Sequence, residues 1–467
     1  MSSARLSALD ASFLDVETPT AHMHVGWAAK FLPPDGGVGP TFDEIRDHIA
    51  GRLGRAPRYR QKLASVPLGV HEPVWIDDAG FDAARHIRCA TSSDLGQVVD
   101  DVMSVPLERD RPLWEIWIAP DLGDGRVGMV GKAHHCMVDG LAAVELATML
   151  LDPQPEAITN VEDQREWRPE PIPGPLERMA GGYAERTRER AGALAGAGRA
   201  LASRQRLTKL PGDAVRLAGT LADTVLPIAP PTRFNRDGSS LRHLESVRRP
   251  LDDLRHIKRE FGVTVNDVVL TAAAGALRAY MEEHGDDPVP LKTMVPVSVR
   301  AEDERGDFGN RISFMFVELP CDEPDSVRRL ELVHAGTSQR KESHEPEQSD
   351  AVLQAAGYLP RVLQRLMSRA VASPLLFNLV VSNIPGPREP MWMCGLELEE
   401  SFPIVPLADR HAVSIGMTTI KDDACFGLYA DRKTLPDVDR LAWHLDAAID
   451  ELYSRAGSPR GEPLAVV

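Results

Sequence analysis

Short runs of apolar residues alternate along this chain with longer segments in which apolar residues recur at helical spacing. The apolar runs predict buried strands at 126–133, 291–298, 312–319, 375–382, 412–420 and 424–430. Helical spacing with start or stop signals predicts helices at 41–52, 94–106, 139–151, 251–261, 264–283, 325–343, 352–372 and 436–453. Because strands alternate with helices in both halves, the pattern predicts an α/β protein built in layers.

Capping residues define several of these helix ends. Thr41 and Glu44 have the spacing of a capping box, and Thr264 and Asp267 open the long helix at 264–283 in a similar way. Gly262 stops the preceding helix, as glycine commonly does just after a last helical turn.

A cluster of prolines divides the chain. Six prolines fall between residues 153 and 175, a composition that does not build a packed core. The 467 residues also exceed what one hydrophobic core usually supports. We therefore expect an N-terminal domain at 1–152, a proline-rich linker and helical crossover at 153–229, and a C-terminal domain at 230–467.

The crossover is rich in arginine between residues 176 and 222, where few acidic residues accompany the basic ones. Two interpretations remain open. The segment is a solvated helical crossover, or it is an interfacial helix held to anionic lipid.

Charge and cysteine content narrow the choice of partners. A formal net charge of −16 and a pI of about 5.4 argue against nucleic acid. Five scattered cysteines without a CxxC pair give no zinc signature and fit a reducing, cytoplasmic compartment. The histidines, including His22 and His24, show no metal-ligand spacing, so no metal is expected. Neither a secretory signal nor an apolar run of about 18 residues is present in the sequence.

The strongest chemical signal is the stretch from His134 to Gly140, which reads HHCMVDG. It lies where a predicted buried strand ends and a predicted helix begins. Acyl transfer to a hydroxyl needs a positioned base, and an imidazole that titrates near neutrality suits that task. The alternative is a helix-capping Asp139-Gly140 pair preceded by two packed histidines. Two adjacent histidines followed by Asp-Gly favour catalysis by a histidine base.

Cys136 within this stretch has two interpretations as well. It could be a nucleophile that forms an acyl-enzyme, or a small buried residue in a turn, and we favour the turn. The sequence contains no Gly-x-Ser-x-Gly motif, which argues against a serine hydrolase.

Several motifs together resemble one family. His134-His135-x-x-x-Asp139-Gly140 resembles the HHxxxDG signature of the chloramphenicol-acetyltransferase-like superfamily. Within that superfamily, further blocks resemble those of the wax ester synthase/diacylglycerol acyltransferases in the same order: Pro112-Leu113-Trp114, NDVVL at 266–270, PVSVR at 296–300, Gly309-Asn310 and SNIPGP at 382–387. The opening Leu9-Asp10-x-x-Phe13 is also similar, whereas 414–420 fits less closely than 426–428.

The resemblance implies a fold and a set of catalytic roles. It implies two chloramphenicol-acetyltransferase-like domains of α+β sandwich type, with mixed sheets flanked by helices and an active-site tunnel at their interface. It implies that His135 is the general base, that His134 supports it, and that Asp139 and Gly140 shape the turn. Asp139 is expected to pair with an arginine, and Arg300 is our candidate because it follows a predicted strand in a matching block.

The same resemblance places Asn266, Asp267, Asn310, Asn383 and Trp114 at or near the substrates. Each has a simpler interpretation. Asn266 and Asp267 are good helix-capping residues, the other two asparagines stand beside turns, and Trp114 suits a hydrophobic core.

In function, the resemblance implies an O-acyltransferase that moves a fatty acyl group from acyl-CoA to diacylglycerol, to a long-chain alcohol, or to both. Acyl-CoA would be a cosubstrate, with no bound cofactor. Lipid substrates imply peripheral association with a membrane or lipid-droplet surface. Two other classes stay open: a condensation-type enzyme that uses carrier-protein thioesters, and a non-catalytic lipid-binding protein.

Overall fold

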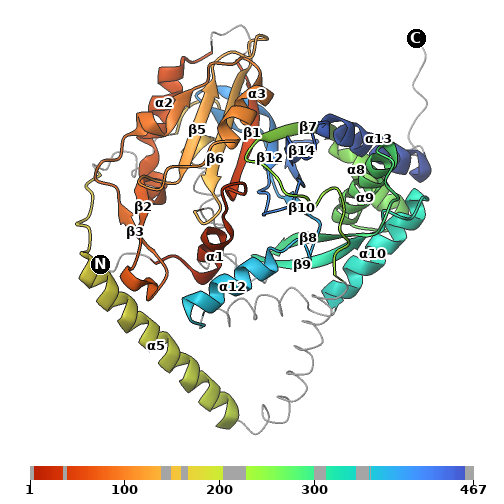
Figure 1. The fold of residues 1–467 in the computed structure, drawn as a ribbon. Coiled ribbons are helices and arrows are strands. Elements are labelled where there is room, and N and C mark those ends of the chain that lie inside the picture. The colour runs from red at the N-terminus through yellow and green to blue at the C-terminus, as the bar shows by residue number, and fades with distance from the viewer. Residues whose placement is uncertain are drawn as a thin grey trace.

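The computed structural model describes residues 5–34, 39–137, 149–158, 167–202, 228–298, 312–342, 357 and 359–457. Within these ranges the chain forms two six-stranded sheets and one two-stranded sheet, with helices packed around them (Figure 1). The mixed α/β architecture predicted from the alternating pattern is confirmed.

The first sheet has the strand order β11-β12-β1-β6-β5-β4. Its strands are β1 (His24–Leu32), β4 (Ile87–Cys89), β5 (Trp114–Ala119), β6 (Val127–His134), β11 (Trp392–Met393) and β12 (Leu396–Ile404). β1 is antiparallel to both neighbours, β12 and β6, while β4 runs parallel to β5. The accompanying elements are α1 (Ala8–Val16), α2 (Phe42–Gly51), α3 (Leu95–Met103), the hairpin of β2 (Gln61–Ala64) and β3 (Val74–Asp77), and 3₁₀ turns at Leu53–Arg55, Pro57–Arg60, Pro67–Gly69 and Ala83–Arg85.

The second sheet has the order β7-β14-β13-β10-β8-β9 and is mixed. Its strands are β7 (Arg242–Pro250), β8 (Leu291–Ser298), β9 (Ile312–Leu319), β10 (Leu379–Ile384), β13 (Val413–Ile420) and β14 (Asp423–Asp431). Its main core forms between this sheet and α8 (Leu251–Phe261), α9 (Val265–Glu283), α10 (Ser326–Glu342) and α13 (Val438–Ala456). α5 (Pro175–Ala202) and α12 (Arg361–Val371) lie outside that core, along the lower edge of the molecule in Figure 1.

One segment crosses from the second half of the chain into the first sheet. β11 and β12 come from residues 392–404, yet β12 pairs with β1 from the N-terminal end. The end of β12 also packs onto the second sheet, since a Cβ on Gly427 would lie only 2.2 Å from the carbonyl oxygen of Pro403. The strands of the first sheet therefore come from both sides of the predicted linker. The domain boundaries at 152 and 230 stay a prediction.

Most helices and strands predicted within the described residues are present within a few residues of their expected limits. Those expected at 126–133 and 291–298, for example, are β6 and β8. The predicted helix at 352–372 is represented by α12. Most of the predicted helix at 139–151 lies outside the described residues, as do residues 203–222 of the basic crossover.

Among the described residues, no single helix is long and apolar enough to cross a membrane. α8 and α9 reach the required length and composition only as a pair, across a bend of 102°.

Candidate active site

The first histidine of the motif ends a strand, and the second begins the turn that follows. β6 is buried along its whole length and ends at His134, which lies opposite His24 of β1. The backbone N–H of His135 then donates a hydrogen bond of 2.9 Å to the carbonyl oxygen of Met23. Met23 has a φ of 51°, which is unusual for a residue other than glycine. The strained residue before β1 therefore anchors the backbone of His135.

Phe13 of α1 positions the imidazole of His135. The two rings are stacked, with 3.8 Å between centroids and 13° between planes. Nδ1 of His135 has no hydrogen-bond partner on any other described residue. Burial lowers the pKa of His135 to about 4, against a smaller raising effect from its own backbone. The imidazole is therefore neutral at physiological pH, as a general base must be.

His134 is almost completely buried and is held by a hydrogen bond on one ring nitrogen, Nδ1. Nδ1 accepts a hydrogen bond of 3.1 Å from the backbone N–H of Cys136, so Nε2 carries the proton of the neutral ring. Nε2 lies 3.8 Å from a carboxylate oxygen of Glu17, which is itself paired with Arg109. Burial, and to a lesser degree the charge of Arg109, keeps the pKa of His134 well below its usual value. These contacts fit a supporting role.

Glu17 and Arg109 were not among the residues singled out in the sequence. Glu17 directly follows α1, and Arg109 lies in the loop after α3, so no local spacing connects them to the histidine pair. Only tertiary structure brings these two charges to His134.

Cys136 is buried, and burial raises the pKa of its thiol to about 12. A thiol with so high a pKa is almost entirely protonated at neutral pH and is a poor nucleophile. The structure therefore favours the interpretation of Cys136 as a buried turn residue.

Four of the predicted site residues lie outside the described residues: Asp139, Gly140, Arg300 and Asn310. The pairing of Asp139 with Arg300 accordingly stays a prediction.

Asp267 is completely buried at the start of α9 and binds four hydrogen-bond donors. Its carboxylate accepts bonds of 2.9 and 2.8 Å from the N–H and hydroxyl of Thr264, 2.6 Å from the hydroxyl of Thr337, and 2.9 Å from Nδ1 of His334. Burial alone would raise the pKa of Asp267, but these hydrogen bonds outweigh it and lower the pKa. The carboxylate caps α9 and binds two residues of α10. Its role is therefore to hold these helices in place, and it affects the site only through their positions.

The other three residues occupy different positions. Asn266 is partly exposed in the first turn of α9. Asn383 lies near the end of β10, opposite Met417 of β13. Trp114 is buried in β5, stacks on His86 and donates a hydrogen bond of 2.8 Å to the carbonyl oxygen of Tyr59. Trp114 thus packs in the core.

The loop after Asn383 is held tightly against β13. A Cβ on Gly386 would lie 2.0 Å from the carbonyl oxygen of Thr419, so only glycine permits this close approach. The backbone N–H of Lys421 also donates a hydrogen bond of 2.9 Å to the carbonyl oxygen of Pro387. The SNIPGP block therefore has a structural reason for its glycine.

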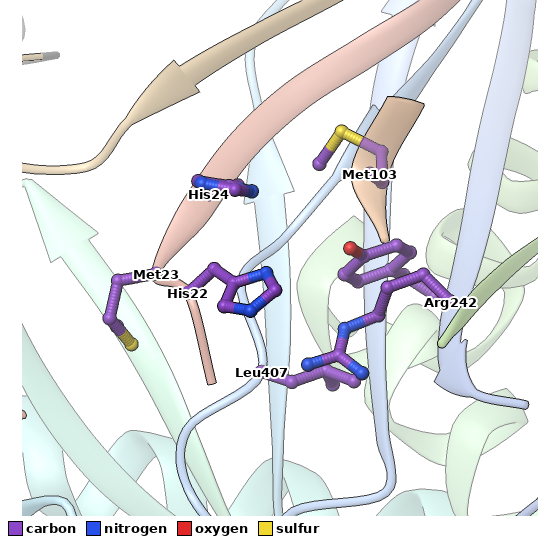
Figure 2. A pocket seen from close by; sticks show the side chains of 7 residues that line it. His22, Met23, His24, Met103, Arg242 and Leu407 are labelled. Carbon is purple, nitrogen blue, oxygen red and sulfur yellow. The ribbon is translucent and has the colours of Figure 1, made fainter. Parts of the chain in front are cut away.

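A crevice too narrow to hold a water molecule lies beside the start of β1 (Figure 2). It is lined by His22, Met23, His24, Met103, Arg242, Leu407 and Tyr429. These residues come from both sheets and from α3, so the crevice lies where the two halves meet. Met23 joins it to the site, because its carbonyl oxygen binds the backbone N–H of His135. Burial lowers the pKa of both His22 and His24.

Arg242 lines both this crevice and a second, wider hollow of about 390 Å³. The wider hollow is also lined by Ser104, Leu241 and Arg432. The guanidinium of Arg242 donates hydrogen bonds to Asp431 and to the carbonyl oxygen of Thr20. Arg242 therefore links the N-terminal and C-terminal halves of the chain at a point that borders both the crevice and the hollow.

Comparison with known proteins identifies the family. The sequence model of the wax ester synthase/diacylglycerol acyltransferase catalytic domain matches residues 6–269, and that of the family's C-terminal domain matches residues 308–453. The chain belongs to this family. It is an acyltransferase, as the HHxxxDG motif indicated.

Relatives along the whole chain agree with the wax ester synthase/diacylglycerol acyltransferase assignment. A putative diacylglycerol O-acyltransferase of Mycobacterium bovis is 30% identical over 467 residues, covering 96% of each chain. A probable diacylglycerol O-acyltransferase of Mycobacterium tuberculosis is 31% identical over 472 residues, covering 96% of this chain and 98% of the relative.

Solved structures show the same two-domain fold. The wax ester synthase/diacylglycerol acyltransferase of Marinobacter aquaeolei is similar with a TM-score of 0.68 and 26% identity, over 97% of this chain and 100% of that one. The first condensation domain of the calcium-dependent antibiotic synthetase shares the fold alone, with a TM-score of 0.58 and 15% identity over 98% and 97% of the two chains. The predicted chloramphenicol-acetyltransferase-like architecture is confirmed.

Acyltransferases of the wax ester synthase/diacylglycerol acyltransferase family use acyl-CoA as a cosubstrate. In the described part of the chain, no group of three or more His, Cys, Asp or Glu side chains is arranged to hold a metal ion.

Proposed function

We propose that this acyltransferase moves a fatty acyl group from acyl-CoA to the free hydroxyl of diacylglycerol, of a long-chain alcohol, or of both, with His135 as the general base. The observation that carries the proposal is the position of His135. Its backbone is anchored on Met23, its ring is stacked on Phe13, and burial lowers its pKa to about 4. The relatives named as diacylglycerol O-acyltransferases support the choice of acceptor.

The neutral imidazole takes the proton from the acceptor hydroxyl as the oxygen attacks the thioester carbonyl of acyl-CoA. The tetrahedral intermediate then collapses, the C–S bond breaks, and the imidazolium of His135 gives the same proton to the leaving thiolate. The products are an ester and free CoA.

The remaining motif residues act around this base. His134 supports the turn through its contacts with Cys136 and Glu17. Asp139 and Gly140 shape the same turn, and Arg300 is the proposed partner of Asp139. Asn266, Asn310 and Asn383 are proposed to line the substrate path, while Asp267 and Trp114 act through the packing described above.

Acceptors of this kind dissolve in lipid, so we place the protein at the cytoplasmic surface of a membrane or lipid droplet. In the described part of α5, two arginine side chains are engaged with the rest of the protein and do not extend into solvent as an interfacial helix would require. Arg178 donates hydrogen bonds to the carbonyl oxygens of Ser65 and Pro173, and Arg186 is buried and binds the carbonyl oxygen of Gly357.

The test is to assay the purified protein with palmitoyl-CoA and either dioleoylglycerol or hexadecanol, and separately with a carrier-bound acyl thioester. The proposal predicts ester formation from acyl-CoA and none from the carrier thioester alone. His135→Gln is expected to remove turnover and keep the fold. His48→Gln is the matched control, because burial lowers the pKa of His48 to about 4 but this residue lies on α2.

Each other outcome has a clear meaning. Turnover from the carrier thioester alone would indicate a condensation-type enzyme, and lipid binding without turnover would indicate a binding protein. Wild-type turnover in His135→Gln would overturn the assignment of the base.

A further inference from the structure

α12 exposes apolar side chains to solvent and turns polar ones toward the protein. Val362, Leu363 and Leu366 are 68%, 45% and 59% exposed. On the inner side, Gln364 is buried and donates hydrogen bonds of 2.8 and 3.1 Å to the carbonyl oxygens of Gly357 and Leu359. This is the reverse of an ordinary surface helix, which buries its apolar side. We call Val362, Leu363 and Leu366 the apolar stripe.

The basic side chains of α12 fix its orientation. Arg361, Arg365 and Arg369 recur every four residues and therefore share one side of the helix. Arg361 and Arg365 bind a carboxylate oxygen of Asp15 at 2.9 and 3.2 Å, and Arg369 donates a hydrogen bond of 3.1 Å to the carbonyl oxygen of Asp15. Three contacts to one residue of α1 hold the helix with its apolar stripe outward.

The charge of α12 is unlike that of the chain as a whole. Residues 361–371 contain three arginines and no acidic residue, whereas the chain has a net charge of −16. The side chain of Arg365 remains 58% exposed although it contacts Asp15. Exposed apolar residues flanked by arginine, without acids, suit the boundary between acyl chains and anionic headgroups. A second copy of an acidic protein matches this combination less well.

α12 is also directly connected to the site. It packs on α1. Asp15 of α1 binds the three arginines of α12, and Phe13 of the same helix stacks on His135. Figure 1 shows α12 beside α1 and far from α13. A lipid surface held by α12 would therefore lie near the helix that positions the base.

We propose that the apolar stripe of α12 inserts into the surface of a membrane that contains anionic phospholipid. The inference rests on the proposed function, because lipid acceptors require the enzyme to reach such a surface. It names α12 as the contact.

The experiment is flotation of the purified full chain with vesicles of phosphatidylcholine and phosphatidylglycerol. The variant Val362→Glu/Leu366→Glu is expected to lower the bound fraction about tenfold, because two inserted apolar side chains become charged. Binding of the wild type is also expected to weaken as salt is raised or phosphatidylglycerol is left out. Trp443→Glu is the matched control, since Trp443 is 57% exposed on α13. Its bound fraction should equal that of the wild type.

A second assay separates this inference from the proposed function. With hexanoyl-CoA and a short alcohol, both in solution without vesicles, the double variant should keep wild-type turnover. Equal flotation of the double variant and the wild type would overturn the inference, as would a wild type that does not bind vesicles. Flotation that is unchanged while sedimentation shows a loss of dimer in the double variant would overturn it too, because the stripe would then be a contact between copies. Failure of the wild type in the soluble assay would count against the proposed function alone.

Discussion

The ring of Phe13 lies parallel to the imidazole of His135, with 3.8 Å between their centroids. Phe13 belongs to α1, and His135 follows β6, so the contact joins two elements that are far apart in sequence. The ring covers one side of the imidazole and restricts its rotation. Phe13 is therefore a positioning residue for the proposed base.

Phe13→Ala is expected to lower kcat about tenfold with little change in KM, because stacking of this kind is worth about 0.5–1.5 kcal/mol and a tenfold rate change corresponds to about 1.4 kcal/mol. Phe13→Tyr should restore most of the rate. Phe81→Ala is the control, since Phe81 stacks on His86 away from the site. Steady-state kinetics on folded variants provides the measurement, and an unchanged kcat in Phe13→Ala would contradict the role.

The acid limb of the pH–rate profile should lie well below the usual titration range of histidine. Burial lowers the pKa of His135 to about 4, and only the neutral imidazole can accept a proton. We expect kcat/KM to stay constant from pH 8 to about 6 and to fall only as pH approaches about 4. The lowered pKa also makes the protein less stable below pH 6.5, because the unfolded chain binds a proton that the folded chain does not. The profile must therefore be recorded where fluorescence shows a folded protein; a midpoint near 6.5 would refute the expectation.

The sequence predicted best those strands that are buried along nearly their whole length. β6 and β13 are of this kind, and apolar or small residues predominate in both. β7 has the sequence RHLESVRRP and β12 the sequence LELEESFPI, and neither was predicted. β7 is an edge strand with many arginines, and β12 alternates leucine with glutamate, a pattern that does indicate a half-buried strand.

The pairing of strands that are far apart in the sequence could not be predicted from local sequence patterns. Nothing near residues 396–404 indicates that they pair with residues 24–32, because the two segments are separated by most of the chain. For the same reason the histidine pair was found from its motif, whereas Glu17 and Arg109 were not. Their charges reach His134 only through the packing of α1 and the loop after α3.

A substitution of Asp267 can show whether this residue is needed for stability or for catalysis. Asp267→Ala should destabilise the protein by about 3 kcal/mol, because it removes a buried acceptor of four hydrogen bonds and leaves the buried hydroxyl of Thr337 without this partner. The lowered pKa of Asp267 means that its contribution is present above pH 3.8 and is lost as pH falls through the folded-state value. Turnover measured below the melting transition should remain within about twofold of the wild type.

Asp252→Ala is the matched control for this prediction. Asp252 stands in the first turn of the neighbouring α8, but it is exposed and contacts only Arg255 among the described residues, at 3.1 Å. Its removal should change the free energy of unfolding by less than about 1 kcal/mol. A large loss of kcat in Asp267→Ala without a loss of stability would show that Asp267 acts on the substrates directly.

The contact between the two halves should depend on pH through His243. Nδ1 of His243 on β7 lies 2.8 Å from Asp100 on α3, and Nε2 lies 3.1 Å from Glu245. The hydrogen bond to Asp100, followed by that to Glu245, raises the pKa of His243 to about 10. Arg432 also faces Asp100, at 3.4 Å. A histidine whose pKa is raised by folding stabilises the protein fully below pH 6.5, and that stabilisation is lost as pH rises through about 10.

We therefore expect His243→Gln to lower the melting temperature most at pH 6 and progressively less toward pH 10, as measured by calorimetry across that range. Asp100→Asn should produce a similar loss at pH 6, and the double variant should lose less than the sum of the two, because both changes remove the same hydrogen bond between charged groups. A loss that is independent of pH, or additive in the double variant, would mean that the imidazolium of His243 does not hold α3 against β7.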